Sequence, residues 1–320
     1  MSVPMIHANR RVAGLPQLDR CAVMGVVNVT PDSFSDGGEY FTAGRAIAHG
    51  LELHAAGVDY LDVGGESTRP GAARVDAAQE LRRVLPVITE LARAGALVSV
   101  DTTRAEVAER ALAAGARIVN DVSGGLADPA MIPFVSQAEV PYILMHWRGH
   151  SADMNDRADY QDVVGEVRAE LARQLGRAVD GGIDPARIVL DPGFGFAKAA
   201  AHDWALAAGL DRLLDLGRPV LVGPSRKRFL GRLLADAAGH PRPAQERDDA
   251  TLALAAILAG RGAWAVRVHA AEAAMDAVKV AAMATATATA PEAGPADPRF
   301  TAPLTAPLTA PFATPEGKAS

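Results

Sequence analysis

Residues 96–121 read ALVSVDTTRAEVAERALAAGARIVND and contain one complete strand–helix–strand unit. The apolar runs at 96–101 and 117–121 are short and nearly continuous, which is typical of strands buried on both faces of a parallel sheet. Between them, Thr103 and Glu106 have the spacing of a helix-initiating capping box, and Gly115 suits the end of that helix. The segment therefore predicts two parallel strands joined by a helix.

The same alternation continues along most of the chain. Eight apolar runs are expected to form strands, at 22–28, 58–63, 96–101, 117–121, 140–145, 187–191, 219–223 and 263–269. Stretches with helical spacing of apolar residues separate them. Eight strands, each followed by a helix, predict an α/β fold of the (β/α)8 TIM barrel type over residues 20–283. An open doubly wound sheet is the alternative, and the even alternation of eight units favours the barrel.

The two ends of the chain differ from this central region. Residues 1–19 form an N-terminal extension that lacks the apolar core of a signal peptide. Residues 284–320 consist mainly of Ala, Thr and Pro, with the repeat TAPL-TAPL-TAPF at 301–312. Such a tract buries too little apolar surface to offset its ordering entropy, so we expect a disordered C-terminal tail.

Composition limits the classes of function. The 320 residues are 49% hydrophobic and 22% charged, as in soluble globular proteins, and the longest apolar stretch, 250–260, is too short to cross a membrane. A net charge of −6 predicts no nucleic-acid or membrane partner, so an anionic substrate requires a local basic pocket. The single cysteine, Cys21, excludes an internal disulfide framework and a Cys-rich metal site. We expect a cytoplasmic protein.

Polar side chains follow every predicted strand, at the end of the barrel where active sites of this fold lie. Three acceptors at the very ends of strands suit the amino and ring N–H donors of a flat heterocycle: Asp101, Asn120 and Asp191. Cationic groups suited to a phosphate or pyrophosphate also occur there: Arg69, Lys227, Arg267 and His269. Aromatic residues in Gly- or Ser-rich loops suit a stacking wall: Phe34, Phe194 and Phe196. Neither a GxxxxGK[ST] phosphate loop nor an HExxH zinc pair occurs in the sequence.

Taken in order, eight strings resemble the dihydropteroate synthase family of pterin-binding barrels. They span about residues 25–283 and read GVVNVTPDSFSDGG (25–38), DVGGESTRPGA (62–72), SVDTTRAEVA (99–108), IVNDVSGG (118–125), ILMHWRG (143–149), LDPGFGFAK (190–198), LVGPSRKRFLG (221–231) and RVH (267–269). The first two strings are long and specific. The resemblance implies an enzyme that joins 6-hydroxymethyl-7,8-dihydropterin pyrophosphate to p-aminobenzoate, giving 7,8-dihydropteroate and pyrophosphate, with Mg²⁺ required and a homodimer expected.

The resemblance also implies roles for individual residues. Asn28 matches the position that contacts the metal ion. The pterin would be bound by Asp101, Asn120, Asp191, Lys227 and Arg267, of which Asp101, Lys227 and Arg267 are the expected catalytic residues. The pyrophosphate would be held by Thr68, Arg69, Arg267 and His269. The p-aminobenzoate pocket would be formed by Phe34, Pro70, Phe196 and Ser225.

Two alternative functions share parts of this pattern. A methyltetrahydrofolate methyltransferase would keep the pterin-binding acceptors but lack the STRPGA and SRK strings, which are present here. A non-catalytic pterin-binding paralogue should have lost a first-loop or cationic residue, and Asn28, Lys227 and Arg267 are all present. Trp147, Asp203, Pro224 and Ala270 depart from residues common in the family, without removing any of these roles.

Overall fold

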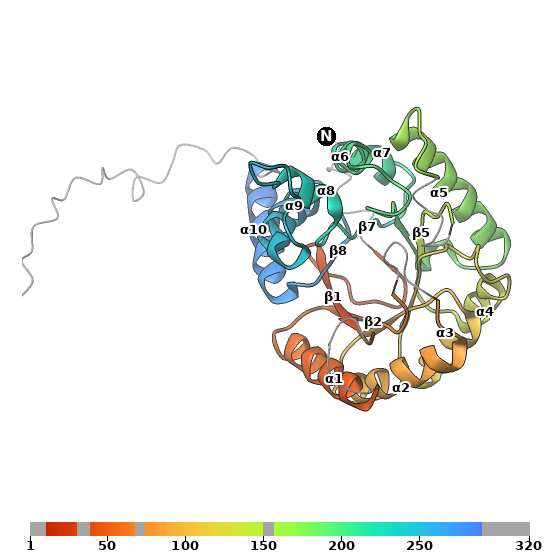
Figure 1. Cartoon of the computed structure of the whole chain (residues 1–320). Coiled ribbons are helices and arrows are strands. Elements are labelled where there is room, and N and C mark those ends of the chain that lie inside the picture. The colour runs from red at the N-terminus through yellow and green to blue at the C-terminus, as the bar shows by residue number, and fades with distance from the viewer. Residues whose placement is uncertain (1–10, 31–38, 68–73, 150–156, 290–320) are drawn as a thin grey trace, which may run out of the picture.

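Eight parallel strands form an inner ring surrounded by helices (Figure 1). The computed structural model describes residues 11–30, 39–67, 74–149 and 157–289. The strands are β1 (Ala22–Asn28), β2 (Tyr60–Gly64), β3 (Val98–Asp101), β4 (Ile118–Asp121), β5 (Tyr142–Met145), β6 (Ile188–Asp191), β7 (Leu221–Val222) and β8 (Ala265–Val268).

The order of the strands confirms the predicted barrel. Hydrogen-bonded neighbours run β6-β5-β4-β3-β2-β1-β8-β7, so β1 pairs with both β2 and β8. β6 and β7 close the ring through one parallel bridge, between Leu190 and Val220, and the Leu190 N–H donates to the Pro219 carbonyl at 2.9 Å. An open doubly wound sheet would leave two edge strands far apart, so that alternative is wrong.

Ten α-helices are found in the described residues, and most of them form the outer ring. They are α1 (Glu39–Ala55), α2 (Ala77–Arg93), α3 (Ala105–Ala113), α4 (Met131–Ala138), α5 (Val163–Asp180), α6 (Ala200–Ala208), α7 (Leu210–Leu214), α8 (Arg228–Leu233), α9 (Asp248–Gly260) and α10 (Ala271–Thr289). Short 3-10 turns occur at η4 (Pro185–Arg187) and η5 (Ala244–Arg247). In α2 the side chains of Val84, Val87, Ile88 and Leu91 are buried against the strands, as their spacing requires.

The alternation of side chains along each strand positions the site. Inward-facing side chains near the start of the strands are apolar and pack into one cluster, which includes Met24, Tyr60, Ile118, Val189 and Ala265. Because side chains repeat their direction every two residues, the next inward-facing position in four of these strands is polar: Asp62, Asn120, Asp191 and Arg267. The same sequence pattern thus fills the floor of the barrel and lines its opposite end with polar groups.

The N-terminal segment covers that apolar floor. Val12 is buried in the same cluster, and Leu15 and Leu18 pack against it. The Ala13 N–H donates to the Ala186 carbonyl at 2.8 Å. Residues 11–19 of the expected N-terminal extension thus pack against the floor of the barrel.

The predicted capping box of α3 is wrong. The helix begins at Ala105, whose N–H donates to Asp128 Oδ2 at 2.8 Å. The Thr103 hydroxyl instead accepts from Arg74 at 3.3 Å. A carboxylate from the loop after β4 thus satisfies the start of this helix, which local spacing could not reveal.

At the C-terminal end, α10 continues to Thr289, six residues beyond the predicted boundary at 283. Residues 290–320, which make up most of the expected tail, lie outside the described residues.

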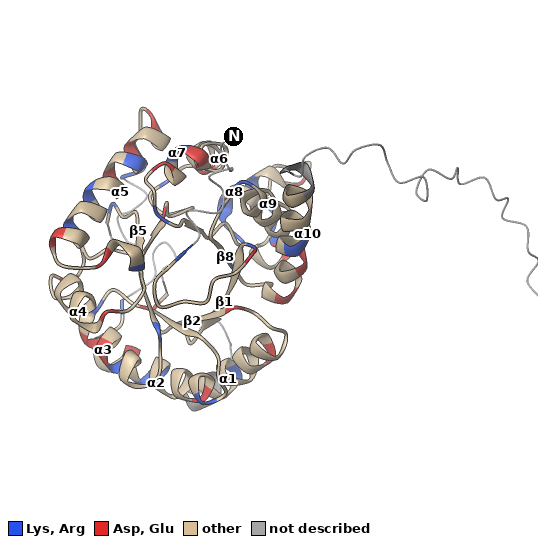
Figure 2. Cartoon of the chain, turned by 180° about the vertical axis from the view of Figure 1, so that it is seen from behind, with Lys and Arg blue, Asp and Glu red and all other residues tan. Residues whose placement is uncertain are grey.

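Within the described part of the chain, no helix combines the length and apolarity needed to span a membrane. Cys21 is buried, as expected. Charges of both signs are interspersed over the outer helices (Figure 2), so local groups must supply the affinity for an anion.

Candidate active site

A cavity of about 700 Å³ opens at the carboxyl ends of the strands. This size is typical of small-molecule sites, and active sites of such barrels lie at this end. The cavity brings together all but four of the predicted site residues: Asn28, Asp101, Asn120, Asp191, Phe196, Ser225, Lys227, Arg267 and His269. The remaining four, Phe34, Thr68, Arg69 and Pro70, lie outside the described residues.

Arg267 is held between two carboxylates. Its Nε donates to Asp62 Oδ2 at 2.6 Å and its Nη2 to Asp101 Oδ2 at 2.8 Å. The Asp62 side chain is fully buried, whereas 23% of the Arg267 side chain remains exposed to the cavity. The guanidinium is thus fixed in orientation while part of it stays available to a ligand.

Asp62 also orients Asn120. The Asn120 Nδ2 donates to the same Asp62 oxygen at 3.0 Å, which leaves the Asn120 Oδ1 as the acceptor for a ligand. Asp62 Oδ1 has no hydrogen-bond partner among the described residues. The sequence placed Asp62 at a strand end but did not include it among the site residues. Its shared inward direction with Asn120 and Arg267 is the signal that could have identified it.

Burial raises the pKa values of the two carboxyls proposed to face the heterocycle. The pKa of Asp101 rises to about 7, since burial and the nearby Asp62 carboxylate outweigh the opposing charge of Arg267. The pKa of Asp191 rises to about 6, although the Gly193 N–H donates to its Oδ1 at 2.7 Å and Lys227 favours its charged form. Both groups therefore titrate close to neutral pH.

Lys227 lies beside the loop that follows β6. Its Nζ is 4.0 Å from the centre of the Phe196 ring. A Cβ on Gly195 would lie 2.7 Å from Lys227 Cδ, and Gly195 has a φ of +73°, so only glycine suits this close approach. Burial and the neighbouring Arg267 lower the pKa of Lys227 to about 8, and nearby carboxylates oppose this shift.

His269 is neutral and linked to Ser225. Burial, together with the positive charges of Arg226, Arg267 and Lys227, lowers the pKa of His269 to about 3. The Ser225 Oγ lies 2.9 Å from His269 Nδ1 and accepts from the His269 backbone N–H at 3.1 Å. With the serine hydroxyl donating to Nδ1, the ring proton is on Nε2, which can then donate to an oxyanion.

A network around Arg226 supports the segment that carries Ser225 and Lys227. Arg226 has a φ of +58°, in the left-handed region. Two hydrogen bonds of 2.7 Å join its guanidinium to Asp248 at the start of α9. Arg247 donates to the Arg226 carbonyl at 2.8 Å. These contacts compensate for an unfavourable backbone conformation next to the cavity.

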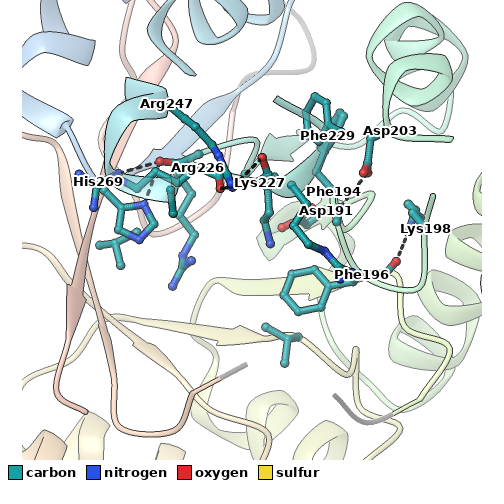
Figure 3. A pocket seen from close by; sticks show the side chains of 18 of the residues that line it. Asp191, Phe194, Phe196, Lys198, Asp203, Arg226, Lys227, Phe229, Arg247 and His269 are labelled. Atoms are coloured by element: carbon teal, nitrogen blue, oxygen red, sulfur yellow. Dashed lines mark hydrogen bonds between the residues drawn. The ribbon is translucent and has the colours of Figure 1, made fainter. Parts of the chain in front are cut away.

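Three further buried polar residues at this site were missed or left without a role by the sequence analysis: His146, Lys198 and Asp203 (Figure 3 labels the last two). Asp203 Oδ1 accepts from the Gly195 N–H at 2.7 Å, and Lys198 Nζ lies 3.1 Å from His146 Nδ1. His146 and Lys198 are 52 residues apart, so no local pattern indicates their contact. Phe194 is only 1% exposed and stacks on Phe229, so it supports the loop rather than forming an exposed wall.

Asn28 has a side chain that could contribute a ligand to Mg²⁺, the ion that the family resemblance implies. It ends β1 and lines the cavity, where its amide oxygen is a suitable hard ligand. Among the described residues, no group of three or more His, Cys, Asp or Glu side chains could hold a metal by itself. This donor set fits an ion that takes most of its ligands from a bound diphosphate and water, as Mg²⁺ commonly does.

The geometry combines two chemical functions in one cavity. Acceptors at the ends of β3, β4 and β6 suit a planar N–H edge, and cations at the ends of β7 and β8 suit a leaving anion.

Comparison with known proteins agrees with this interpretation of the cavity. The pattern that defines pterin-binding enzymes matches residues 24–269. Dihydropteroate synthase of Mycobacterium leprae is 56% identical over 259 residues, covering 81% of this chain and 91% of the relative.

The chain belongs to the dihydropteroate synthase family. Solved structures of the family have the same fold. The synthase of Xanthomonas albilineans with 4-aminobenzoic acid has a TM-score of 0.79 and 44% identity, covering 88% of this chain and 100% of that one. The same organism's synthase in complex with 7,8-dihydropteroate has a TM-score of 0.76 and 42% identity, covering 87% and 98%.

Membership of the dihydropteroate synthase family confirms the resemblance seen in the sequence. The chain is an enzyme of folate biosynthesis that condenses a pterin with p-aminobenzoate to give dihydropteroate. The methyltransferase alternative is wrong, because the matching relatives catalyse a different class of reaction.

Proposed function

We propose that the cavity binds 6-hydroxymethyl-7,8-dihydropterin pyrophosphate with its pterin edge on Asp101, Asn120 and Asp191. The observation that carries this proposal is the fixed orientation of Asn120 and Arg267 by the single carboxylate of Asp62, at 3.0 and 2.6 Å. That arrangement presents an acceptor and a cation to the same cavity. Lys227 and Arg267 then lie where charge develops during the reaction.

The reaction begins with cleavage of the bond between the pterin methylene carbon and the ester oxygen that joins it to the diphosphate. The electron pair leaves with pyrophosphate, and Arg267 with the His269 Nε2–H stabilises the added negative charge. The methylene cation is delocalised over the pterin ring, and the carboxylates Asp101 and Asp191 favour this positive charge. A bound Mg²⁺, held by Asn28 and the diphosphate, would supply further charge neutralisation on the leaving group.

The p-aminobenzoate nitrogen then attacks the methylene carbon with its lone pair. We propose that its ring lies against Phe196 and that Ser225 contributes to the same pocket; Phe34 and Pro70 are expected to complete it. Formation of the C–N bond releases one proton, which the departing pyrophosphate or water can accept. A strong general base is unnecessary because the electrophile is already activated.

The proposed reaction requires three components, and omission of each tests it. The purified protein is incubated with the pterin pyrophosphate, p-aminobenzoate and Mg²⁺, and both pyrophosphate and dihydropteroate are measured. We expect equal amounts of the two products in the complete mixture and neither product when any one of the three components is omitted. A folded protein that binds the pterin but forms neither product would contradict the proposed reaction. Light scattering on the same sample would test the expected homodimer.

A further inference from the structure

Lys198 is a buried basic residue that lines the cavity and has no role in the proposed reaction. It lies in the loop between β6 and α6, and only 5% of it is exposed. Its Nζ donates to the Phe196 carbonyl at 3.0 Å and lies 3.1 Å from His146 Nδ1 (Figure 3 shows the first contact). Lys198 therefore contacts the backbone of the residue whose ring faces Lys227.

The contact with His146 connects Lys198 to the outer helix ring. His146 Nε2 lies 2.7 Å from Glu170 Oε2 on α5, and Arg148 donates to both oxygens of Glu170 at 2.5 and 3.1 Å. Burial, with Lys198 nearby, lowers the pKa of His146 to about 4, so the ring is neutral. Its Nδ1 then accepts from Lys198 and its Nε2–H donates to Glu170.

The backbone around Phe196 needs such support. Ala197 has a φ of +47°, in the left-handed region that a residue with a Cβ rarely adopts. Gly193 and Gly195 also have positive φ values, of +70° and +73°. An unfavourable conformation of this kind persists only where surrounding contacts fix it. Here Asp203 holds the Gly195 N–H from α6, and Lys198 holds the Phe196 carbonyl.

Burial and nearby charges have opposite effects on the protonation of Lys198. Burial lowers the pKa of Lys198 to about 7, while the negative charges of Asp203 and Asp191 favour its protonated form. The ammonium uses two of its three donors on Phe196 and His146. Its two identified partners are thus groups of the protein, which distinguishes it from a cation reserved for a ligand.

We propose that Lys198 is a positioning residue for p-aminobenzoate binding, acting through the Phe196 carbonyl to fix the aromatic ring that borders that substrate. The inference rests on the proposed function, in which Phe196 contacts p-aminobenzoate. It assigns to Lys198 an effect on one substrate only. The pterin acceptors on β3 and β4 do not depend on this loop, because Arg267 donates to Asp101 and Asn120 donates to Asp62.

The test is Lys198→Met, which keeps the length of the side chain but removes its donors. We expect the KM for p-aminobenzoate to rise about tenfold, because the orphaned carbonyl and the Ala197 turn relax together. The Kd of the pterin pyrophosphate, measured by calorimetry, should change by less than about twofold. Lys279→Met is the matched control, because Lys279 is exposed on α10. It should change neither the KM for p-aminobenzoate nor the Kd of the pterin pyrophosphate. A selective rise in the Kd of the pterin pyrophosphate would overturn the inference and make Lys198 a diphosphate ligand.

The effect of Lys198→Met in a protein that already carries Phe196→Leu separates this inference from the proposed function. If Phe196→Leu raises the KM for p-aminobenzoate, Lys198→Met should add less than about twofold in that background, since its target ring is absent. A full additional effect, or no effect of Lys198→Met in the native background, would overturn the role of Lys198 alone. No effect of Phe196→Leu would overturn both assignments. If Lys198→Met does not fold, Glu170→Gln should raise the same KM by a smaller factor, and an unchanged KM would contradict the proposal.

Discussion

The Nε atom of Arg267 on β8 donates to Oδ2 of Asp62 on β2 at 2.6 Å, across the intervening strand β1. This bond joins a fully buried carboxylate to the cation that we propose stabilises departing pyrophosphate. Because Asn120 donates to the same oxygen, one side chain below the cavity determines how two groups in the cavity are oriented.

Removal of Asp62 should therefore destabilise the protein. Asp62→Ala leaves Arg267 with one carboxylate in a largely buried position, and breaking such a pair costs about 3 kcal/mol. Chemical denaturation measures the change in the free energy of unfolding. Asp276→Ala removes an exposed partner of Lys279 and should cost less than about 0.5 kcal/mol. Equal effects of the two variants would contradict the structural importance of Asp62.

Asp101 and Lys227 should be essential for turnover but not for folding. Asp101→Ala removes a carboxylate proposed to bind the pterin edge, and Lys227→Ala removes a cation beside it. Each should lower kcat/KM by about a hundredfold or more, as is usual for groups that stabilise transition-state charge. Circular dichroism should show an unchanged fold. Native turnover in both variants would overturn the assignment of the site.

The affinity for the pterin should decrease at acidic pH. Burial raises the pKa of Asp191 from its ordinary value of 3.8 to about 6, so the carboxylate that accepts from the pterin is lost as the pH falls through 6. The effect on stability has the opposite sign: between about pH 4 and 6 the folded protein binds the proton more strongly, so stability decreases as the pH rises.

Calorimetry with a dihydropterin that lacks the diphosphate would measure this pH dependence without titration of the ligand's phosphate groups. We expect the affinity of the native protein to rise through about pH 6, and Asp191→Asn to bind weakly and to lose the inflection near pH 6, with only the titration of Asp101 near pH 7 remaining. An inflection near pH 6 that survives in Asp191→Asn would show that another group controls binding.

Gly195 should be required because of its approach to Lys227. Gly195→Ala places a Cβ 2.7 Å from Lys227 Cδ and also strains a φ of +73°. Gly217→Ala is the matched control, since Gly217 has a φ of +72° and no atom within 4 Å of the added Cβ. Both variants should lose about 1 kcal/mol of stability, but only Gly195→Ala should lower kcat/KM. Equal activities of the two variants would contradict the importance of this contact.

The C-terminal tract should be dispensable beyond the end of α10. A chain ending at residue 289 should keep the native Tm and activity, because the composition of 290–320 predicts no packed structure. A chain ending at residue 283 also loses the last helical turns, including the Thr285 hydroxyl bond to the Ala281 carbonyl at 2.8 Å. Its Tm should be lower. A decrease in activity on removal of 290–320 alone would contradict this expectation.

The sequence predicted the barrel and the polar rim because both depend on local periodicity. The runs that became β3 and β4 end at Asp101 and Asp121, as predicted. Their starts were less accurate, since pairing with neighbouring strands determines where each strand begins. β7 has only two residues, Leu221–Val222, although a five-residue run was expected at 219–223.

The contacts that position the site were not predictable in the same way. Asp62 and Arg267 are 205 residues apart, and Lys198 and His146 are 52 apart. Each pair forms only when distant strands or loops meet, so strand periodicity can indicate that Asp62 and Arg267 face inward, but no local pattern indicates either contact. The residues implied by the family resemblance were therefore identified by their strings, whereas the buried residues that support them required the structure.

A crystal structure of the protein with the pterin pyrophosphate and a non-reactive analogue of p-aminobenzoate would test the proposed binding mode most directly. We predict that the pterin N–H groups lie within hydrogen-bond distance of Asp101, Asn120 Oδ1 and Asp191, with the diphosphate on Arg267 and His269 and the aromatic ring against Phe196. A pterin bound away from the ends of β3, β4 and β6 would contradict this binding mode.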